Sequence, residues 1–374
     1  MFEFNLRNYG FFELFLCMLL NAIGLVFIRS SLTGSMYSFI SQLLISILSL
    51  IFCILISFLN LKRVFQRYFI FFWLTIMVLF SVYLIGIAWG RNSMRWVDIP
   101  IIHVKLQPSE FAKLFEILFL SKYIEKMDVK INRFGNLMKV VGFFIVPFLM
   151  ILLQPNLSSS LIMLVIFLSL LFSSKLDSRW FIFGGIAFIL LFGTIYLSAK
   201  NGWIYNLPLL KDYQKQRIVS FFNNDEDDQG TYQQENSAIA IGSGRLTGKG
   251  INNDSTQSVK NGNWLAEEQN DFIFAVVGEE VGFLGSSLII FLYMLLVARC
   301  FLISNKQREM YKKLICVGVG SWIGFQSFVN MGVATSLIPN TGVPLPFFSQ
   351  GGSALLSIYM GMGFVINIKR DIRG

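Results

Sequence analysis

Charged residues are scarce in this chain of 374 amino acids. Asp, Glu, Lys and Arg together make up only 14% of it, whereas hydrophobic residues make up 55%. Soluble globular domains carry about a quarter charged residues. The scarcity of charge therefore excludes an ordinary soluble protein and favours a protein that lies in a lipid bilayer.

Cysteine and histidine are scarcer still. The four cysteines lie in apolar runs or at their ends without a CxxC spacing, and the single histidine is His103. This composition suggests neither a disulfide framework nor a zinc site, and the sequence contains no Ser–His–Asp set. The phosphate-binding pattern GxxxxGK[ST] is absent as well, which excludes a P-loop.

Long apolar runs fill most of the chain. Each is long enough to cross roughly 30 Å of hydrocarbon, and the runs are continuous rather than alternating, which favours helices over a barrel. We predict an all-α polytopic membrane protein, a single domain over residues 1–374. About ten spans are expected, near residues 11–29, 37–59, 69–89, 107–123, 137–153, 157–174, 180–198, 272–298, 312–332 and 348–367. The first run follows Arg7 without a small-residue cleavage site and is read as a retained span rather than a signal peptide.

The net charge of +9 is distributed by loop. Alternate connections hold Lys62, Arg63 and Arg67; Lys122, Lys126, Lys130, Arg133 and Lys139; Lys175 and Arg179; Arg299, Lys306, Arg308, Lys312 and Lys313; and Lys369, Arg370 and Arg373. The positive-inside bias places these connections and both termini in the cytoplasm. The basic charge is thereby explained without a nucleic-acid partner.

Residues 199–271 form one long polar loop between the seventh and eighth spans. Loops of this length are usually functional or disordered. This one contains aromatic residues, an apolar AIAIG stretch at 238–242 and several glycines. We therefore predict short helices on the outer membrane face, joined by tight turns.

Asp271 closes the long loop where the next apolar run begins. A partly desolvated carboxylate at this boundary is suited to general-base catalysis, but Asp before a helix is also a common N-cap, and the two roles are compatible. Glu279 and Glu280 fall inside the same span, where an unpaired charge costs roughly 2.5 kcal/mol or more. We expect partners for both, and Glu280 is either a structural partner or a direct participant.

A second polar group precedes and opens the fourth span. Glu110 and Lys113 are spaced i, i+3 on one helix face, which is compatible with a self-contained ion pair or with the wall of a wetted cavity. Arg95 and Trp96 lie just upstream, in an outward segment. An aromatic belt accounts for Trp96, whereas Arg95 lies on the side that is poor in positive charge.

Basic residues also occur in the long loop, at Arg217, Arg245 and Lys249. The last two stand among glycines in SGRLTGKG, where backbone N–H groups beside a cation would suit a phosphate. Solvated loop charge is the alternative. Further on, three prolines between 339 and 346 interrupt a helix before SQGGS, which ends at Ser353 and opens the last span.

Several sequence blocks, taken in order, resemble one family. GRNSMRWVDIP with QPSEFAKL, QPNLSSS, IAIGSG with GKG and TQS, NDFIFAVVGEEVGFLG and GVPLPFFSQGGSALL are similar to the SEDS proteins, named for shape, elongation, division and sporulation. The resemblance covers nearly the whole chain. It looks closest to the elongation member RodA, and VGEE is similar to the division member FtsW.

The resemblance implies a peptidoglycan glycosyltransferase of the bacterial inner membrane. Such an enzyme polymerises lipid II at the outer face of that membrane, with inversion, during cell elongation, and works with a class B penicillin-binding protein and other elongation-complex proteins. The family's catalytic aspartate matches Asp271. Arg95, Lys113, Arg217 and Lys249 become candidates for the pyrophosphate, because a leaving diphosphate requires cations. Supporting roles are expected for Glu110, Trp96, Glu280, Gln257 and Ser353.

A divalent cation, Mg²⁺ or Mn²⁺, could bridge a carboxylate to the diphosphate, although the sequence does not demand one. The chain departs from the family pattern at Asn156, Gln269, Asn270 and Gln350.

Two other functions stay open: a transporter of the lipid-linked precursor and a non-catalytic scaffold of the cell-wall complex. A transporter would place its ionisable residues near the midplane, whereas a polymerase would gather them at the outer face.

Overall fold

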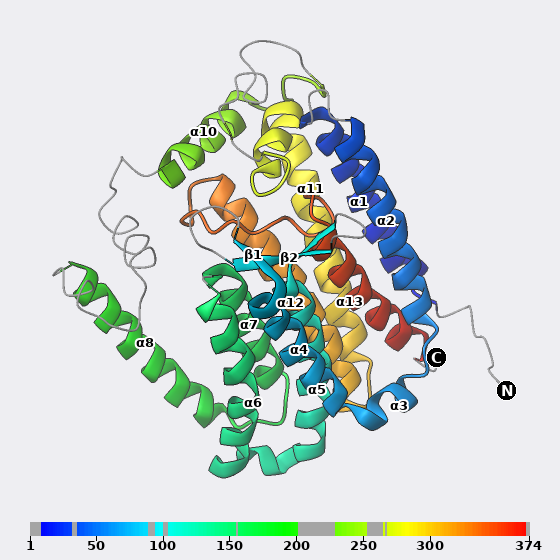
Figure 1. The fold of residues 1–374 in the computed structure, drawn as a ribbon, viewed down its shortest axis with the longest axis vertical. Coiled ribbons are helices and arrows are strands. Elements are labelled where there is room, and N and C mark those ends of the chain that lie inside the picture. The colour runs from blue at the N-terminus through cyan, green and yellow to red at the C-terminus, as the bar shows by residue number, and fades with distance from the viewer. Residues whose placement is uncertain are drawn as a thin grey trace.

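The computed structural model describes residues 9–31, 36–88, 94–99, 104–154, 156–200, 229–252, 265 and 268–371. Ten of its helices coincide with the ten predicted ranges (Figure 1). They are α1 (Phe11–Ser31), α2 (Met36–Ser57), α4 (Phe69–Ile85), α5 (Pro108–Met127), α6 (Phe134–Leu153), α7 (Leu157–Phe172), α8 (Ser178–Lys200), α11 (Ile273–Asn305), α12 (Met310–Ala334) and α13 (Gly352–Arg370). Shorter helices are α3 (Leu61–Val64), η2 (Phe65–Arg67), η3 (Asp128–Asn132) and α10 (Gln229–Ser243).

The described helices differ in whether they are long and apolar enough to cross a membrane. Six are long and apolar enough by length and composition, or seven when α4 is counted with α3 and η2, from which it bends by 68°. Helix α7 has only 16 residues, and α5 carries several charges. The chain is thus a polytopic helical membrane protein, and the number of ten crossings stays a prediction.

Helices α12 and α13 form the centre of the bundle. In each, 72% of the most apolar window is buried, compared with 28% in α2 and α6. The outer helices expose large apolar side chains, such as Leu44, Trp73 and Phe283. This distribution is expected where the solvent is lipid. All four cysteines are free and buried.

Helix α8 stands apart from the other helices. Figure 1 shows it leaning away from the bundle along most of its length. Near its start, Trp180 stacks on Phe134 of α6 at 6.2 Å between ring centroids, and Phe181 meets Phe172 of α7 at 5.6 Å. Aromatic contacts therefore hold the beginning of α8 against its neighbours.

A small antiparallel sheet accompanies the helices of this all-α fold. Its three strands are β1 (Gly86–Ala88), β2 (Met94–Ile99) and β3 (Val104–Leu106), in the order β1-β2-β3. Ile87 pairs with Trp96, and Val97 pairs with Leu106. Strand β2 contacts α4 and α5, and β3 contacts α13. The segment of Arg95 and Trp96, which the sequence predicts to face outward, is therefore partly a folded sheet against the bundle.

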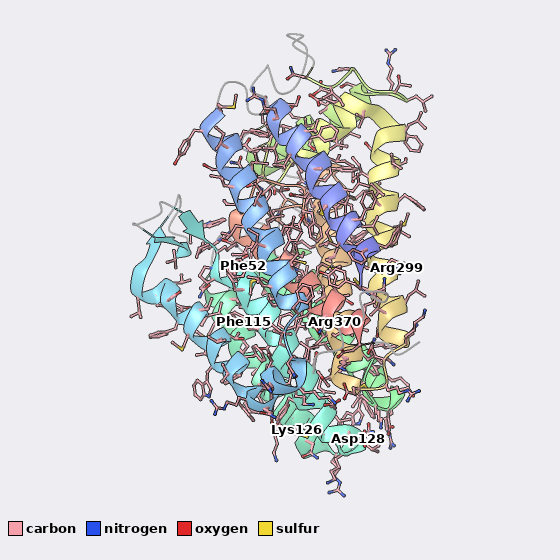
Figure 2. The ribbon with its side chains drawn as sticks, turned by 90° about the vertical axis from the view of Figure 1, so that its right-hand side faces the viewer. Phe52, Phe115, Lys126, Asp128, Arg299 and Arg370 are labelled. Atoms are coloured by element: carbon pink, nitrogen blue, oxygen red, sulfur yellow. The ribbon has the colours of Figure 1, made fainter. Side chains whose placement is uncertain are left out.

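The basic connections gather at one end of the bundle. Asn132 on η3 donates to the carbonyl of Lys175 at 3.0 Å, and Lys312 pairs with Asp371 at 3.1 Å. Figure 2 shows Lys126 at this end, which we call the basic end. Gathering of these connections on one side is what their distribution along the sequence predicts.

Glu13 joins three helices toward the basic end. Its carboxylate is fully buried, and it accepts from Arg299 Nε of α11 at 2.8 Å and from Lys369 Nζ of α13 at 2.6 Å. The later half of α11 therefore lies toward the basic end. Because α11 has 33 residues, its N-terminus reaches the opposite end of the bundle.

Glu116 on α5 is a buried carboxyl without a visible role. It is 1% exposed, and neither carboxylate oxygen has a hydrogen-bond partner among the described residues. Such a group costs its full desolvation, so an apolar residue of similar size is expected to stabilise the fold. We expect Glu116→Leu to raise the free energy of unfolding by about 1–3 kcal/mol, measured by denaturant titration in one detergent. Glu116→Gln, which keeps an unsatisfied polar group, is the control, and a less stable leucine variant would show that the carboxyl has a partner.

Candidate active site

Helix α11 is broken at Gly282, where φ is 62° and ψ is −161°. The loop that follows α10 binds across this break. Backbone carbonyls of residues 279 and 280 accept from the N–H groups of residues 249 and 250 at 2.9 and 3.0 Å. Beyond the break, the N–H groups of 283 and 284 donate to the carbonyls of 245 and 246 at 2.9 and 3.1 Å. The loop thus satisfies backbone groups that the break would leave unpaired.

This arrangement gives the charged residues of the loop and helix their partners. Lys249 Nζ lies 2.6 Å from Glu279 Oε1. Glu280 Oε1 accepts from the hydroxyl of Ser30 on α1 and from the N–H of Asn252 at 3.2 Å. The partners expected for Glu279 and Glu280 are therefore present. In this conformation Lys249 forms an ion pair, and its own N–H and that of the next glycine bind helix carbonyls rather than facing an anion.

Close packing at the break makes one glycine sensitive to substitution. A Cβ on Gly244 would lie 1.9 Å from the carbonyl oxygen of Gly278, whereas nothing lies within 4 Å of a Cβ on Gly242. Gly244→Ala is expected to destabilise the protein by about 2–3 kcal/mol or more, because backbone atoms would have to move. The matched Gly242→Ala, in the last turn of α10, is expected to be neutral or slightly stabilising. Denaturant unfolding of both variants checks the expectation, and equal stabilities would contradict the close packing.

Helix α10 confirms the prediction of a short helix within the 199–271 loop. Gln234 Nε2 donates to the carbonyl of Ile338 at 2.6 Å, and its Oε1 accepts from the N–H of Asn340 at 3.1 Å. Ser237 donates to the carbonyl of Ala334 at 2.7 Å. The helix is therefore anchored to the end of α12 and to the segment that leads to Gly342.

Asp271 lies at the end of the bundle opposite the basic end. Helix α11 begins at Ile273 with Phe272 as its N-cap, one residue after Asp271. Asp271 is half-buried. A Cβ on Gly342 would lie 3.2 Å from its Oδ2, so the carboxylate lies against the backbone of that glycine. Asp271 therefore lies just before the start of α11, and its role as a base stays a prediction.

Glu110 and Lys113 form an ion pair inside the bundle. Lys113 Nζ lies 2.8 Å from Glu110 Oε1 and 3.0 Å from Gln326 Oε1 of α12. The ammonium also lies 4.9 Å from the centroid of the Trp322 ring. Lys113 is fully buried, which supports the ion-pair interpretation. A pyrophosphate would reach the ammonium only after this pair opened.

The N-terminus of α5 is joined to two other helices. The N–H of Gln107 donates to Ser353 Oγ at the start of α13 at 2.8 Å. Asn156 caps α7 by accepting from the N–H of Ser159, and its Nδ2 donates to Ser109 Oγ at 3.2 Å. Ser353 therefore joins α13 to the start of α5, and its supporting role in the site stays a prediction. Asn156, one of the departures noted above, thus caps a helix with its amide oxygen.

Two buried amides of α12 connect the α5 pair with Asp271. Gln326 accepts from Lys113 and donates to the carbonyl of Pro344 at 2.9 Å. Asn330, one turn further on, donates to the carbonyls of Val343 and Asp271. The ion pair and Asp271 are thus both linked to one short segment, the first through Pro344 and the second through Val343. The sequence prediction missed both amides, although two polar side chains four residues apart in an apolar span were a signal for an inward face.

The remaining predicted residues are placed as follows. Arg95 and Trp96 lie on β2, and both are half-buried. Because side chains alternate along a strand, these two point to opposite faces of the sheet. Arg217 and Gln257 lie outside the described residues. Within the described part of the chain, no three His, Cys, Asp or Glu residues are gathered so that they could hold a metal ion.

The sequence of this chain is similar to that of several known proteins. The model of the cell cycle protein family that unites FtsW, RodA and SpoVE matches residues 11–374. A probable peptidoglycan glycosyltransferase FtsW of Buchnera aphidicola is 30% identical over 80% of this chain and 81% of its own length. Stage V sporulation protein E of Bacillus subtilis is 34% identical over 81% of this chain and 77% of its own length.

Solved structures share the fold. One chain, from work on the structural coordination of polymerization and crosslinking by a peptidoglycan synthase complex, superposes with a TM-score of 0.80 at 27% identity. It covers 97% of this chain and 98% of its own length. The rod shape determining protein RodA of Thermus thermophilus superposes with a TM-score of 0.71 at 25% identity, over 98% of both chains.

Proposed function

The chain belongs to the FtsW/RodA/SpoVE family of cell cycle proteins, the SEDS family, and on that premise we propose that it is a peptidoglycan glycosyltransferase. Several of its relatives carry that activity in their names. The observation that carries the proposal is the position of Asp271, fixed in a polar network at the end of the bundle opposite the basic end. We propose that the basic end and both termini are cytoplasmic, which places Asp271 at the outer face of the inner membrane.

The proposed reaction transfers a glycan from one lipid-linked substrate to another. The 4-hydroxyl of an acceptor GlcNAc gives its proton to the Asp271 carboxylate, while its oxygen attacks the anomeric carbon of a donor MurNAc. The bond from that carbon to the pyrophosphate breaks, the polyprenyl pyrophosphate leaves, and the configuration inverts. Asp271 contributes as a general base, and the polymerised substrate is lipid II.

The leaving pyrophosphate requires positive charge. Arg95 and Arg217 are the proposed contacts, Arg95 from β2 and Arg217 from the long loop. Lys113 and Lys249 would join them only if their ion pairs with Glu110 and Glu279 opened. We also propose that a divalent cation, Mg²⁺ or Mn²⁺, would supply further positive charge to the diphosphate if a carboxylate of the site held it.

The proposal assigns the chain to cell elongation, with a class B penicillin-binding protein as its transpeptidase partner and with other elongation-complex proteins. The blocks IAIGSG, GVPLP and GFVINIKR, which resemble RodA, support this assignment. A structural neighbour from a complex that couples polymerization with crosslinking supports the partner. Depletion of the chain in its own cells separates the roles, because round cells follow from an elongation defect and filaments from a division defect.

Purified protein tests the activity directly. We expect the chain, alone or with its transpeptidase partner, to convert labelled lipid II into long glycan strands that are resolved on a gel. A transporter would instead move labelled precursor across vesicle membranes without forming strands, and a scaffold would do neither. Absence of strands in the presence of the partner would refute the glycosyltransferase.

A further inference from the structure

Asn330 makes two hydrogen bonds with one buried amide. It lies on α12 and is 1% exposed. Its Nδ2 donates to the carbonyl of Asp271 at 2.8 Å and to the carbonyl of Val343 at 2.7 Å. These carbonyls belong to segments far apart in sequence. Only the NH₂ side of an amide can serve two carbonyl oxygens, so its orientation is fixed by chemistry.

The two carbonyls belong to segments that meet beside the Asp271 carboxylate. That carboxylate rests against Gly342, the residue before Val343, with Oδ2 3.2 Å from the position of a Cβ on the glycine. Asn330 thus binds the backbone of the proposed base and the backbone beside its carboxylate. A change in the length of either bond would alter the position and orientation of the carboxylate.

Two neighbouring hydrogen bonds also act on these segments, and one of them joins the same two segments. Gln350 donates its N–H to the carbonyl of Gln269 at 2.9 Å, before the Asp271 turn. Gln326 binds the carbonyl of Pro344, after Val343. Asn330 adds a link between the two segments at Asp271 itself, two residues after the Gln350–Gln269 bond.

We propose that Asn330 is a positioning residue for Asp271. It acts through the backbone and does not touch substrate, and the inference rests on the glycosyltransferase function proposed above. A displacement of about 1 Å in a reacting group can lower turnover by about 100-fold, so loss of this amide should act on kcat rather than on KM.

A matched control for substitution of Asn330 lies toward the basic end of the bundle. Asn367 on α13 is also 1% exposed, and its Nδ2 also donates to two backbone carbonyls, those of Ile56 at 2.9 Å and Leu59 at 2.8 Å. Helix α13 ends three residues later, at Arg370, toward the basic end. Removal of either amide costs a similar pair of buried hydrogen bonds, but only Asn330 adjoins Asp271.

The experiment compares Asn330→Ala and Asn367→Ala in lipid II polymerisation, with unfolding measured in the same detergent. We expect similar losses of stability, a fall in kcat of about 10- to 100-fold for Asn330→Ala, and a kcat within about 2-fold of wild type for Asn367→Ala. KM should stay nearly constant in both variants. The midpoint of the acid limb of the pH–rate profile should also stay where it is, because Asn330 binds the main chain of Asp271 and not its carboxylate.

Equal kcat values for the two variants would overturn the positioning role. If Asn330→Ala is not recovered folded, Asn330→Ser, which keeps one donor, replaces it with a smaller expected fall and the same comparison. Asp271→Asn distinguishes failure of the positioning role from failure of the proposed glycosyltransferase function. Wild type that makes strands, an inactive Asp271→Asn and an unaffected Asn330 variant would refute this inference alone, whereas wild type without strands would refute the proposed function as well.

Discussion

Asp271→Asn is expected to lower the rate of strand formation by about 100- to 10,000-fold, the usual contribution of a general base. The amide has nearly the shape of the carboxylate but cannot accept the proton of the acceptor hydroxyl. Asn330 binds the main-chain carbonyl of residue 271, so the substitution leaves that anchor unchanged. The fold and the binding of lipid II should therefore persist, and kcat should fall while KM and the unfolding midpoint stay close to wild type.

Asp371 provides the matched substitution at the basic end. It is the C-cap residue of α13 and pairs with Lys312 at 3.1 Å. Because it is far from the proposed site, Asp371→Asn should keep strand formation within about 2-fold of wild type, as expected for loss of a partly exposed ion pair. Strand formation by Asp271→Asn at a similar rate would remove Asp271 from the mechanism.

Much of the helical architecture could be predicted because apolar length is a local property. Each of the ten predicted ranges falls on a described helix, since a continuous apolar run can satisfy its backbone only as a helix in lipid. The sheet at residues 86–106 could not be predicted in the same way. Its strands have three to six residues, and their pairing depends on neighbours that the sequence pattern does not reveal.

The break at Gly282 also escaped the sequence analysis. It lies in a run that reads as one span, and the only local signal is a glycine among several. Its partners are in the SGRLTGKG loop, more than 30 residues upstream. For this loop the sequence leaves an anion cradle and solvated charge as alternatives, because local spacing alone cannot distinguish an approach to phosphate from an approach to another backbone.

Part of the candidate site could be predicted, because some of its residues are recognisable from local sequence spacing. Asp271 stands at the edge of an apolar run, and the i, i+3 spacing of Glu110 and Lys113 is visible in one helix. Gln326 and Asn330 could not be assigned, because their roles come from carbonyls of the 343–344 segment and of Asp271. Contacts between segments that are distant in sequence need the structure.

Lys113→Met is expected to lower the free energy of unfolding by about 3–5 kcal/mol. Lys113 is fully buried and bonds to Glu110 and Gln326, and Trp322 faces its ammonium. Methionine fills similar space but leaves Glu110 as a buried carboxylate without its cation. That uncompensated charge, rather than the lost contacts, accounts for most of the expected effect. Denaturant titration in mixed micelles measures it.

The double variant Glu110→Gln/Lys113→Met separates stability from catalysis. It removes both charges, so we expect it to recover most of the lost stability, because a neutral pair carries no uncompensated charge. Strand formation should recover with it, since the ammonium is enclosed in the folded protein and touches protein groups. A stable but inactive double variant would show instead that Lys113 contacts the pyrophosphate. A double variant as unstable as Lys113→Met would contradict the assignment of the effect to the isolated Glu110 charge.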